Sequence, residues 1–431
     1  MTASKPAITL GLIGFGNVGQ GVHEIVNTNQ AMIAKRLGGQ SVKIKTICVR
    51  TPEKYKHLVQ TETLTNNPND IFTDPDIDIV VEVIGGEDPA YDYIVQALSH
   101  KKHVVTANKE LIAKHKKTFF ELAKQHDVDI LFEASVGGGI PIIKSFKVGY
   151  SANQMESVYG ILNGTTNYIL TKLFEDQQAF DTVLKDAQAL GFAEADPTAD
   201  VSGLDAAYKI VILTAVALKL DIQIDDVFYQ GIDAIQLTDI QYLNDMGFRV
   251  KLIAKATRVM EKVFAAVYPM AIPVDHPLAM VRNEFNAIFS MGNMVGESMI
   301  YGKGAGSLPT GSAVMSDILD IAFDIKAQLS RRHLETSLGT CPVLSIDDNQ
   351  TEFYIRLSVS DEPGALEKIT NTCSDASINI SKLIQKERLN NTATVVILTS
   401  QVAESAFNSF KQKLKGLSVV HAIDAVIRVG L

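Results

Sequence analysis

Short apolar runs alternate with amphipathic stretches through the first 135 residues. An apolar run covers 8–13, and apolar residues then recur at helical spacing at Val18, Val22, Ile25 and Val26. The alternation continues with strands predicted at 42–49, 77–84, 102–106 and 129–134, a helix at 91–99 and another from 107. Strands that alternate with helices predict a doubly wound parallel sheet, with ligands beyond the carboxyl ends of its strands.

A glycine-rich turn joins the first predicted strand to the first predicted helix. It consists of Gly14, Phe15, Gly16, Asn17, Val18 and Gly19. Glycines at this spacing let backbone N–H groups meet a pyrophosphate at a helix N-terminus, as in a Rossmann domain. The strand at 42–49 ends in Arg50, which suits the 2′-phosphate of NADP. We therefore expect NADP, with NAD possible; the alternatives are a turn without ligand and a solvated arginine.

Two further residues, Thr106 and Lys109, fall at the carboxyl end of a predicted strand. That position is where a doubly wound sheet binds its ligands. Lys109 is therefore better placed than most lysines of the chain to contact a cofactor or a substrate.

Residues 193–209 concentrate carboxylates ahead of a lysine. The acidic residues are Glu194, Asp196, Asp200 and Asp205, and the lysine is Lys209. Ser202 is the expected N-cap of the apolar helix that follows, which places Asp205 in the first turn and Lys209 on the same face. Because 210–218 is apolar on all sides, the helix should be buried. A lysine facing carboxylates can donate a proton; an ordinary surface ion pair is the alternative.

Three other segments combine glycine with small polar side chains. They are 133–141, which ends in Pro141 near the first position of a helix, 160–167, and 301–306, which precedes a helical stretch near 312–329. Such segments hold polar ligands or form simple turns with an N-cap, and both interpretations stay open at this point.

Composition narrows the function classes. The net charge of −9 argues against a nucleic-acid partner. Cys48, Cys341 and Cys373 are too widely spaced for a disulfide framework or a metal site, which fits a reducing cytoplasm. No apolar run is long enough for a bilayer, no signal peptide is evident, and 431 residues suit two or three domains.

Taken together, six segments resemble the homoserine dehydrogenase family. They are 14–19, 106–109, 133–141, 163–167, 191–209 and 302–306. The resemblance implies reversible NAD(P)-dependent reduction of L-aspartate 4-semialdehyde to L-homoserine, in the biosynthesis of threonine, methionine and isoleucine. It also implies a homodimer or homotetramer, built from a Rossmann domain at 1–134 completed by a returning helix near 307–330, and an α+β substrate-binding and dimerisation domain at 135–335.

The resemblance also implies roles for individual residues. Lys209 matches the general acid, and Lys109 a second catalytic lysine beside nicotinamide and substrate. Glu194 and Asp205 match substrate ligands, Gly191 contributes its backbone, and Asp200 is a further active-site carboxylate. Gly306 matches a cofactor contact. A site for a monovalent cation such as Na⁺ or K⁺, formed largely by backbone carbonyls, is matched by Glu133, Val136, Gly138 and Ile140.

The C-terminal segment, 351–431, follows a linker at 341–350 and is predicted to have the order βαββαβ. With its Asp361-x-Pro363-Gly364-x-Leu366 turn, the segment resembles an ACT domain. That resemblance implies a regulatory unit that binds a small amino acid, here L-threonine as the expected effector. We expect the unit to be separable, so that a chain truncated near Asp348 stays folded and active.

Two other classes compete with this interpretation. An aspartate-semialdehyde dehydrogenase would need a cysteine nucleophile, and no cysteine lies in the middle domain. A non-catalytic amino-acid sensor would not need the set formed by Glu194, Asp205 and Lys209.

Overall fold

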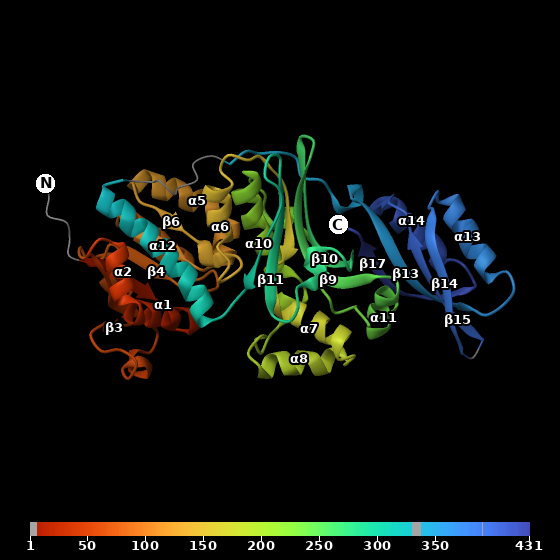
Figure 1. Ribbon diagram of the computed structural model, residues 1–431, viewed down its shortest axis with the longest axis horizontal. Coiled ribbons are helices and arrows are strands. Elements are labelled where there is room, and N and C mark those ends of the chain that lie inside the picture. The colour runs from red at the N-terminus through yellow and green to blue at the C-terminus, as the bar shows by residue number, and fades with distance from the viewer. Residues whose placement is uncertain (1–6, 330–337, 390) are drawn as a thin grey trace. The chain divides into compact units, whose positions relative to one another are not determined.

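The computed structural model describes residues 7–329, 338–389 and 391–431 (Figure 1). The chain divides into two compact units. The first comprises Met1–Glu156, Val211–Ile224 and Asn286–Thr340, and the second Ser157–Ile210, Asp225–Phe285 and Cys341–Leu431. Within the described ranges, no helix has both the length and the apolar character needed to cross a membrane.

A six-stranded sheet forms the centre of the first unit, with the order β3-β2-β1-β4-β5-β6 and parallel pairing throughout. Its strands are β1 (Ala7–Ile13), β2 (Ser41–Cys48), β3 (Thr63–Thr65), β4 (Ile79–Glu82), β5 (His103–Thr106) and β6 (Ile130–Leu131). The intervening helices are α1 (Asn17–Thr28), α2 (Gln30–Arg36), α3 (Asn69–Phe72), α4 (Ala90–Ser99) and α5 (Lys109–His126). The predicted doubly wound parallel sheet is confirmed, with its switch point between β1 and β4.

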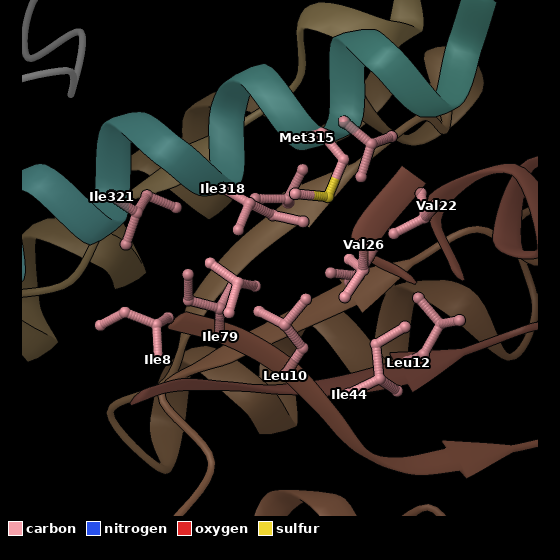
Figure 2. Close-up of a cluster of buried hydrophobic side chains, with 14 of the residues drawn as sticks. Ile8, Leu10, Leu12, Val22, Val26, Ile44, Ile79, Met315, Ile318 and Ile321 are labelled. Atoms are coloured by element: carbon pink, nitrogen blue, oxygen red, sulfur yellow. The ribbon is translucent and has the colours of Figure 1, made fainter. Parts of the chain in front are cut away.

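A helix from much later in the chain covers this sheet. In α12 (Ser307–Ala327), Met315, Ile318 and Ile321 pack over β1 and β4 beside α1, as Figure 2 shows. The approach of α1 and α12 is close, since a Cβ added to Gly21 would lie 2.2 Å from the carbonyl oxygen of Ser307. The absence of a side chain at Gly21 therefore lets the start of α12 pack directly against α1.

The last strand of this sheet is shorter than the sequence predicts. The apolar run suggested 129–134, but β6 ends at Leu131 and a 3₁₀ turn follows at Glu133–Ser135. Glu133 is fully buried, and its carboxylate accepts from the N–H groups of Ile143 and Lys144, both at 2.8 Å. Its own N–H donates to Asp317, so this residue leaves the strand ladder to cap the helical segment α6 (Ile142–Lys144). The remaining elements of this part of the chain are the π-helical turn Ser145–Gly149 and two paired strands, β11 (Phe285–Gly292) and β12 (Gly296–Lys303).

The second unit contains a mixed sheet with the order β7-β9-β10-β17-β13-β15-β14. Its earlier elements are β7 (Met155–Ile161), α7 (Gly164–Glu175), α8 (Phe180–Ala189), α9 (Thr198–Val201), α10 (Leu204–Leu213), β8 (Phe228–Tyr229), α11 (Leu237–Asp245), β9 (Phe248–Val259), β10 (Lys262–Pro273) and the 3₁₀ turn η6 (Pro277–Met280). The later ones are β13 (Gln350–Ser360), α13 (Ala365–Asp375), β14 (Ile380–Leu389), β15 (Thr392–Thr399), β16 (Val402–Ala403), α14 (Glu404–Lys415) and β17 (Val420–Val429). Apart from the two-residue β16, the C-terminal elements follow the predicted βαββαβ order.

The C-terminal segment is joined to the rest of the second unit by more than a linker. Strand β17 pairs with β10 in parallel, with Ala271 opposite Val429. The buried Arg356 on β13 donates to both carboxylate oxygens of Asp239 on α11, at 2.7 and 3.2 Å. Tyr354 donates to the same carboxylate at 2.9 Å. Sheet pairing and a buried ion pair thus hold the tail to this unit, and its separability stays a prediction.

Candidate active site

The helix that carries the lysine begins one residue later than its predicted cap implies. The sequence predicted Ser202 as N-cap, but α10 starts at Leu204 and Ser202 is the C-cap of the short helix α9. Gly203 turns the chain between the two helices with a φ of +86°, a conformation that favours glycine. The helix then runs into a π-helical stretch at Thr214–Leu218 that is buried throughout, which confirms the predicted burial.

Lys209 lies at the centre of a buried hydrogen-bond network. Its ammonium donates to Asp205 Oδ2 at 2.6 Å and to the carbonyl oxygen of Leu162 at 2.7 Å. Asp205 is 4% exposed and Lys209 9% exposed. An ordinary ion pair on a helix surface would be solvated on both sides, so burial rules out that alternative here. Two of the three ammonium hydrogens are used in these contacts, which leaves one for a substrate.

Asn163 connects this pair to a second carboxylate. Its amide Nδ2 donates to Asp205 Oδ2 at 2.8 Å and to Asp200 Oδ1 at 2.7 Å. Its Oδ1 accepts from the backbone N–H of Thr166, so the same side chain is the N-cap of α7. The segment 160–167 is therefore a strand end and a helix start, and its polar side chains both cap the helix and reach the carboxylates.

Thr165 holds the other oxygen of Asp200. Its hydroxyl lies 2.9 Å from Asp200 Oδ2 and 2.6 Å from the carbonyl oxygen of Phe192. Sequence reasoning assigned no role to Asn163 or Thr165 individually, although both lie in the polar segment that it singled out. Only the fold brings them to carboxylates about 40 residues away.

Gly191 and Glu194 lie on the segment between α8 and α9, and both are exposed. Gly191 has a φ of +77° and open space where a side chain would be, so its backbone is accessible. Among the contacts of the described residues, the Glu194 carboxylate has no hydrogen bond to the Asp205–Lys209 network, whereas its carbonyl oxygen accepts from Gln188 at 3.1 Å. The structure thus brings together Asp200, Asp205 and Lys209, and leaves Glu194 facing solvent.

The glycine fingerprint has the geometry that a pyrophosphate needs. Gly16 is the N-cap of α1, without a side-chain cap, and a Cβ added to it would meet nothing within 4 Å. A Cβ added to Gly19 would lie 2.5 Å from the carbonyl oxygen of Gly14, so this glycine permits the tight turn. The first-turn N–H groups of α1 are therefore open to an anion. The residues fit a dinucleotide cofactor.

The exposed Arg50 lies two residues after Cys48, the last residue of β2, at the carboxyl end of that strand. The N–H of Gly14 donates to the carbonyl oxygen of Cys48 at 3.0 Å, which holds the fingerprint against the same strand end. On the other side, Gly306 precedes α12 with a φ of +121°, and the Ser307 hydroxyl donates to the carbonyl oxygen of Asn17 at 2.6 Å. Arg50 and Gly306 thus both lie on segments bonded to the fingerprint turn.

Thr106 forms a hydrogen bond with the carboxyl group of Glu82, a residue that the sequence did not single out. Its hydroxyl donates to Glu82 Oε2 at 2.6 Å and accepts from the N–H of Asn108 at 2.9 Å. Burial raises the pKa of the Glu82 carboxyl above its usual range, and the bond from Thr106 opposes that shift. Asn108 caps α5, whose first residue is the half-buried Lys109. The polar contacts at this strand end therefore fix the position from which Lys109 extends.

The residues matched to a cation site form one turn. Val136, Gly138 and Ile140 follow the buried Glu133 closely in sequence, and Gly137 and Gly138 adopt φ angles of +72° and +51°. A Cβ on Gly138 would lie 2.5 Å from the carbonyl oxygen of Gly304, so the turn is packed against a second backbone segment. The carbonyl oxygens of such a turn are the ligand type that hard cations take.

Two buried polar side chains, Glu133 and Asn286, lie beside this turn. Burial, and then the nearby Asp317, raise the pKa of the Glu133 carboxyl to about 7, and that carboxyl already accepts two backbone N–H groups. Asn286 is buried beside Gly304, and its amide nitrogen and oxygen have no hydrogen-bond partner within the part of the chain that is described. Asn286 had no sequence signal, because an isolated asparagine in a strand is unremarkable until its surroundings are known.

Comparisons with known proteins identify relatives over nearly the whole chain. The family described as "Homoserine dehydrogenase, NAD binding domain" matches residues 14–133, and "Homoserine dehydrogenase" matches residues 141–319. The homoserine dehydrogenase of Bacillus subtilis is 39% identical, with 98% of each chain covered, and that of Synechocystis is 39% identical over 98% of this chain and 99% of the relative. Among solved structures, a homoserine dehydrogenase from Thiobacillus denitrificans has a TM-score of 0.93 at 38% identity, with 98% of each chain covered. One from S. aureus has a TM-score of 0.77 at 36% identity, also with 98% of each chain covered.

Proposed function

The chain belongs to the homoserine dehydrogenase family and is an NAD(P)-dependent oxidoreductase, and we propose how its residues carry out the reaction. That reaction is the reversible reduction of L-aspartate 4-semialdehyde to L-homoserine. The observation that carries the proposal is the buried contact between Lys209 and Asp205, with one ammonium hydrogen left for a substrate oxygen.

Lys209 is the general acid in the direction of reduction. Negative charge builds on the aldehyde oxygen as the alcohol forms, and an ammonium group beside that oxygen both stabilises the charge and donates the proton. Asp205 and the carbonyl oxygen of Leu162 hold the ammonium in place.

Glu194 and Asp205 bind the substrate ammonium, and Gly191 contributes its backbone. The exposure of Glu194 supports a role at the entrance to the site, where a carboxylate attracts the cationic end of the amino acid. Asp200 positions the site. Asn163 and Thr165 bind its two carboxylate oxygens, and these contacts connect the start of α7 to the 191–205 segment.

NADP is the preferred cofactor, with NAD possible, and when bound it supplies or accepts the hydride. The N–H groups of Gly16, Asn17 and Val18 would hold the pyrophosphate, within a turn shaped by Gly14, Phe15 and Gly19. Arg50 would pair with the 2′-phosphate. Thr106, Lys109 and Gly306 would lie along the rest of the cofactor, with Lys109 as the second lysine beside the reacting groups.

The remaining proposals concern ions, domains and assembly. The turn formed by Glu133, Val136, Gly138 and Ile140 holds Na⁺ or K⁺ through its carbonyl oxygens. Residues 351–431 form an ACT domain that binds L-threonine near the turn at 361–366, while residues 1–134 and 135–335 form the cofactor and substrate domains. The enzyme assembles as a homodimer or homotetramer.

The reaction is tested with the purified full chain, L-aspartate 4-semialdehyde and NADPH. The expected result is consumption of NADPH together with formation of L-homoserine, identified by chromatography. If the chain binds NADPH but forms no homoserine, the proposed reaction is wrong. Threonine regulation is tested in the same assay with L-threonine and, as control, L-serine: inhibition by threonine alone supports the effector, and equal rates refute it.

A further inference from the structure

A pocket distinct from the Asp205–Lys209 network lies in the second unit, at the C-terminal end of α7. It has a volume of about 50 Å³ and is lined by residues of α7, α11, β9 and the turn η6. A cavity of ~10–15 Å³ on this measure already holds one water molecule, so this pocket has room for more than a single water. The N-terminal end of α7 carries Asn163, and the pocket begins at Leu170 and extends to Glu175. At ~1.5 Å per residue, the lining segment from Leu170 to Glu175 is about 10 to 18 Å along the helix from Asn163.

The charged residues that line this pocket are mostly cationic. They are Arg249, Lys251 and Arg282, against the single carboxylate of Glu175 among the described lining residues. Glu175 pairs with Arg282 at 3.2 Å and is itself partly exposed. With Lys251 protonated, three positive charges against one negative charge leave an excess of two, which attracts an anion.

Lys251 is the most buried of the three cations, and its ammonium donates only to uncharged acceptors among the described residues. It is 4% exposed, and the acceptors of its ammonium within the described residues are uncharged: Asn167 Oδ1 at 2.9 Å and the carbonyl oxygen of Val281. A buried ammonium without a carboxylate partner is costly. Burial lowers its pKa to about 7; Arg249 and Arg282 act in the same direction, and Glu175 opposes them. An anion in the pocket would compensate this charge.

The other two cations are held in place by neighbours that leave donors available. Arg249 stacks over the ring of Phe174, 3.9 Å from its centroid, and donates through one terminal nitrogen to Asn244 and to a backbone carbonyl. A guanidinium has five N–H donors in a fixed fork that matches a carboxylate. Arg282 is more than half exposed and can reorient toward a ligand. Both are suited to meet an anion that enters from solvent.

The rest of the lining decides what kind of anion fits. Apolar side chains surround the charged groups: Leu170, Phe174, Ile240, Val274, Ala279 and Met280. Inorganic phosphate would gain nothing from these surfaces, whereas a short hydrocarbon chain would be removed from water. We propose that this pocket binds a small carboxylate with a short aliphatic chain, at a site separate from the one where the reaction occurs.

Titration calorimetry of the full chain tests the proposal, with butyrate as probe and n-butylamine and inorganic phosphate as comparisons. Butyrate should bind and n-butylamine should not. Arg282→Gln and Lys251→Met should each weaken butyrate binding about tenfold or more, since each removes a charged hydrogen-bond donor. Lys262→Gln removes an exposed cation on β10 that does not line the pocket, and should bind butyrate like the wild type.

Three results would overturn the proposal. They are binding of neither butyrate nor phosphate, butyrate binding that is equal in Arg282→Gln and in the wild type, and binding of phosphate without binding of butyrate. The last result would mean that the apolar lining takes no part. Arg282 is largely exposed, so its replacement should leave the fold intact, and a thermal melt of each variant confirms that a loss of binding is not a loss of structure.

Discussion

Replacing Lys209 with methionine removes the ammonium while keeping most of the side-chain volume. The turnover of homoserine should fall by ~10²–10⁴, which is the usual effect of losing a general acid. The same change leaves Asp205 buried at 4% exposure without its counter-ion. Breaking a buried pair from one side costs ~3–5 kcal/mol of folding free energy. Because Asn163 still donates to Asp205 at 2.8 Å, we expect about 3 kcal/mol, the lower end of that range.

Those two effects can be separated by a second substitution. In Lys209→Met/Asp205→Asn the unpaired charge is gone, so stability should recover toward the wild-type value while the turnover stays low. A matched control is Lys172→Met on α7, which breaks the i,i+4 pair with Asp176 at the surface. That pair is worth less than about 1 kcal/mol, and the control should keep full activity.

The assay combines initial rates of NADPH formation with urea unfolding of all four proteins, wild type included. The reasoning fails if Lys209→Met keeps more than half of the wild-type turnover. It also fails if the double variant recovers turnover together with stability, because the lysine would then serve only the fold.

Three other predictions follow from the same arrangement. Glu194→Gln should raise the KM for homoserine much more than the KM for NADP, and a change confined to the cofactor constant would contradict the placement of Glu194 at the substrate. Arg50→Asp should weaken NADP binding and spare or improve NAD binding, since a carboxylate repels the 2′-phosphate; equal losses in titrations with both cofactors would show that Arg50 has no part in the preference. Truncation at Asp348 should lower the melting temperature, because it removes Arg356 and exposes the fully buried Asp239, and a truncated chain that melts like the full one would show that these contacts add nothing.

The sequence predicted the fold of the first unit well because its apolar runs carry the information directly. Strands such as β1 are buried almost throughout. The glycine-rich turn after β1 joins a strand to a helix, which is typical of a dinucleotide-binding domain. The predicted boundaries were wrong at two places where a single residue changed the path of the chain. Glu133 ends a strand early by capping a helical segment, and Gly203, not the predicted N-cap Ser202, directly precedes the first residue of α10.

The candidate site was predicted in part. The i,i+4 spacing is enough to place Lys209 beside Asp205, because a helix brings these positions together. It cannot show that Asn163 binds both Asp200 and Asp205, since those contacts depend on how β7 and α7 meet α9 and α10. It also cannot show which strand pairs with β10, whose residues are nearly all buried and would suit many partners. The attachment of the C-terminal segment therefore escaped sequence reasoning.

The central claim is that this chain transfers a hydride between C4 of homoserine and a nicotinamide cofactor. It is tested most directly by incubating the full chain with NADP and L-homoserine deuterated at C4, and by analysing the NADPH formed by mass spectrometry. The account predicts one deuterium in each NADPH, carried on the nicotinamide ring. NADPH that forms without deuterium, or no NADPH at all from a chain that binds NADP, would contradict it.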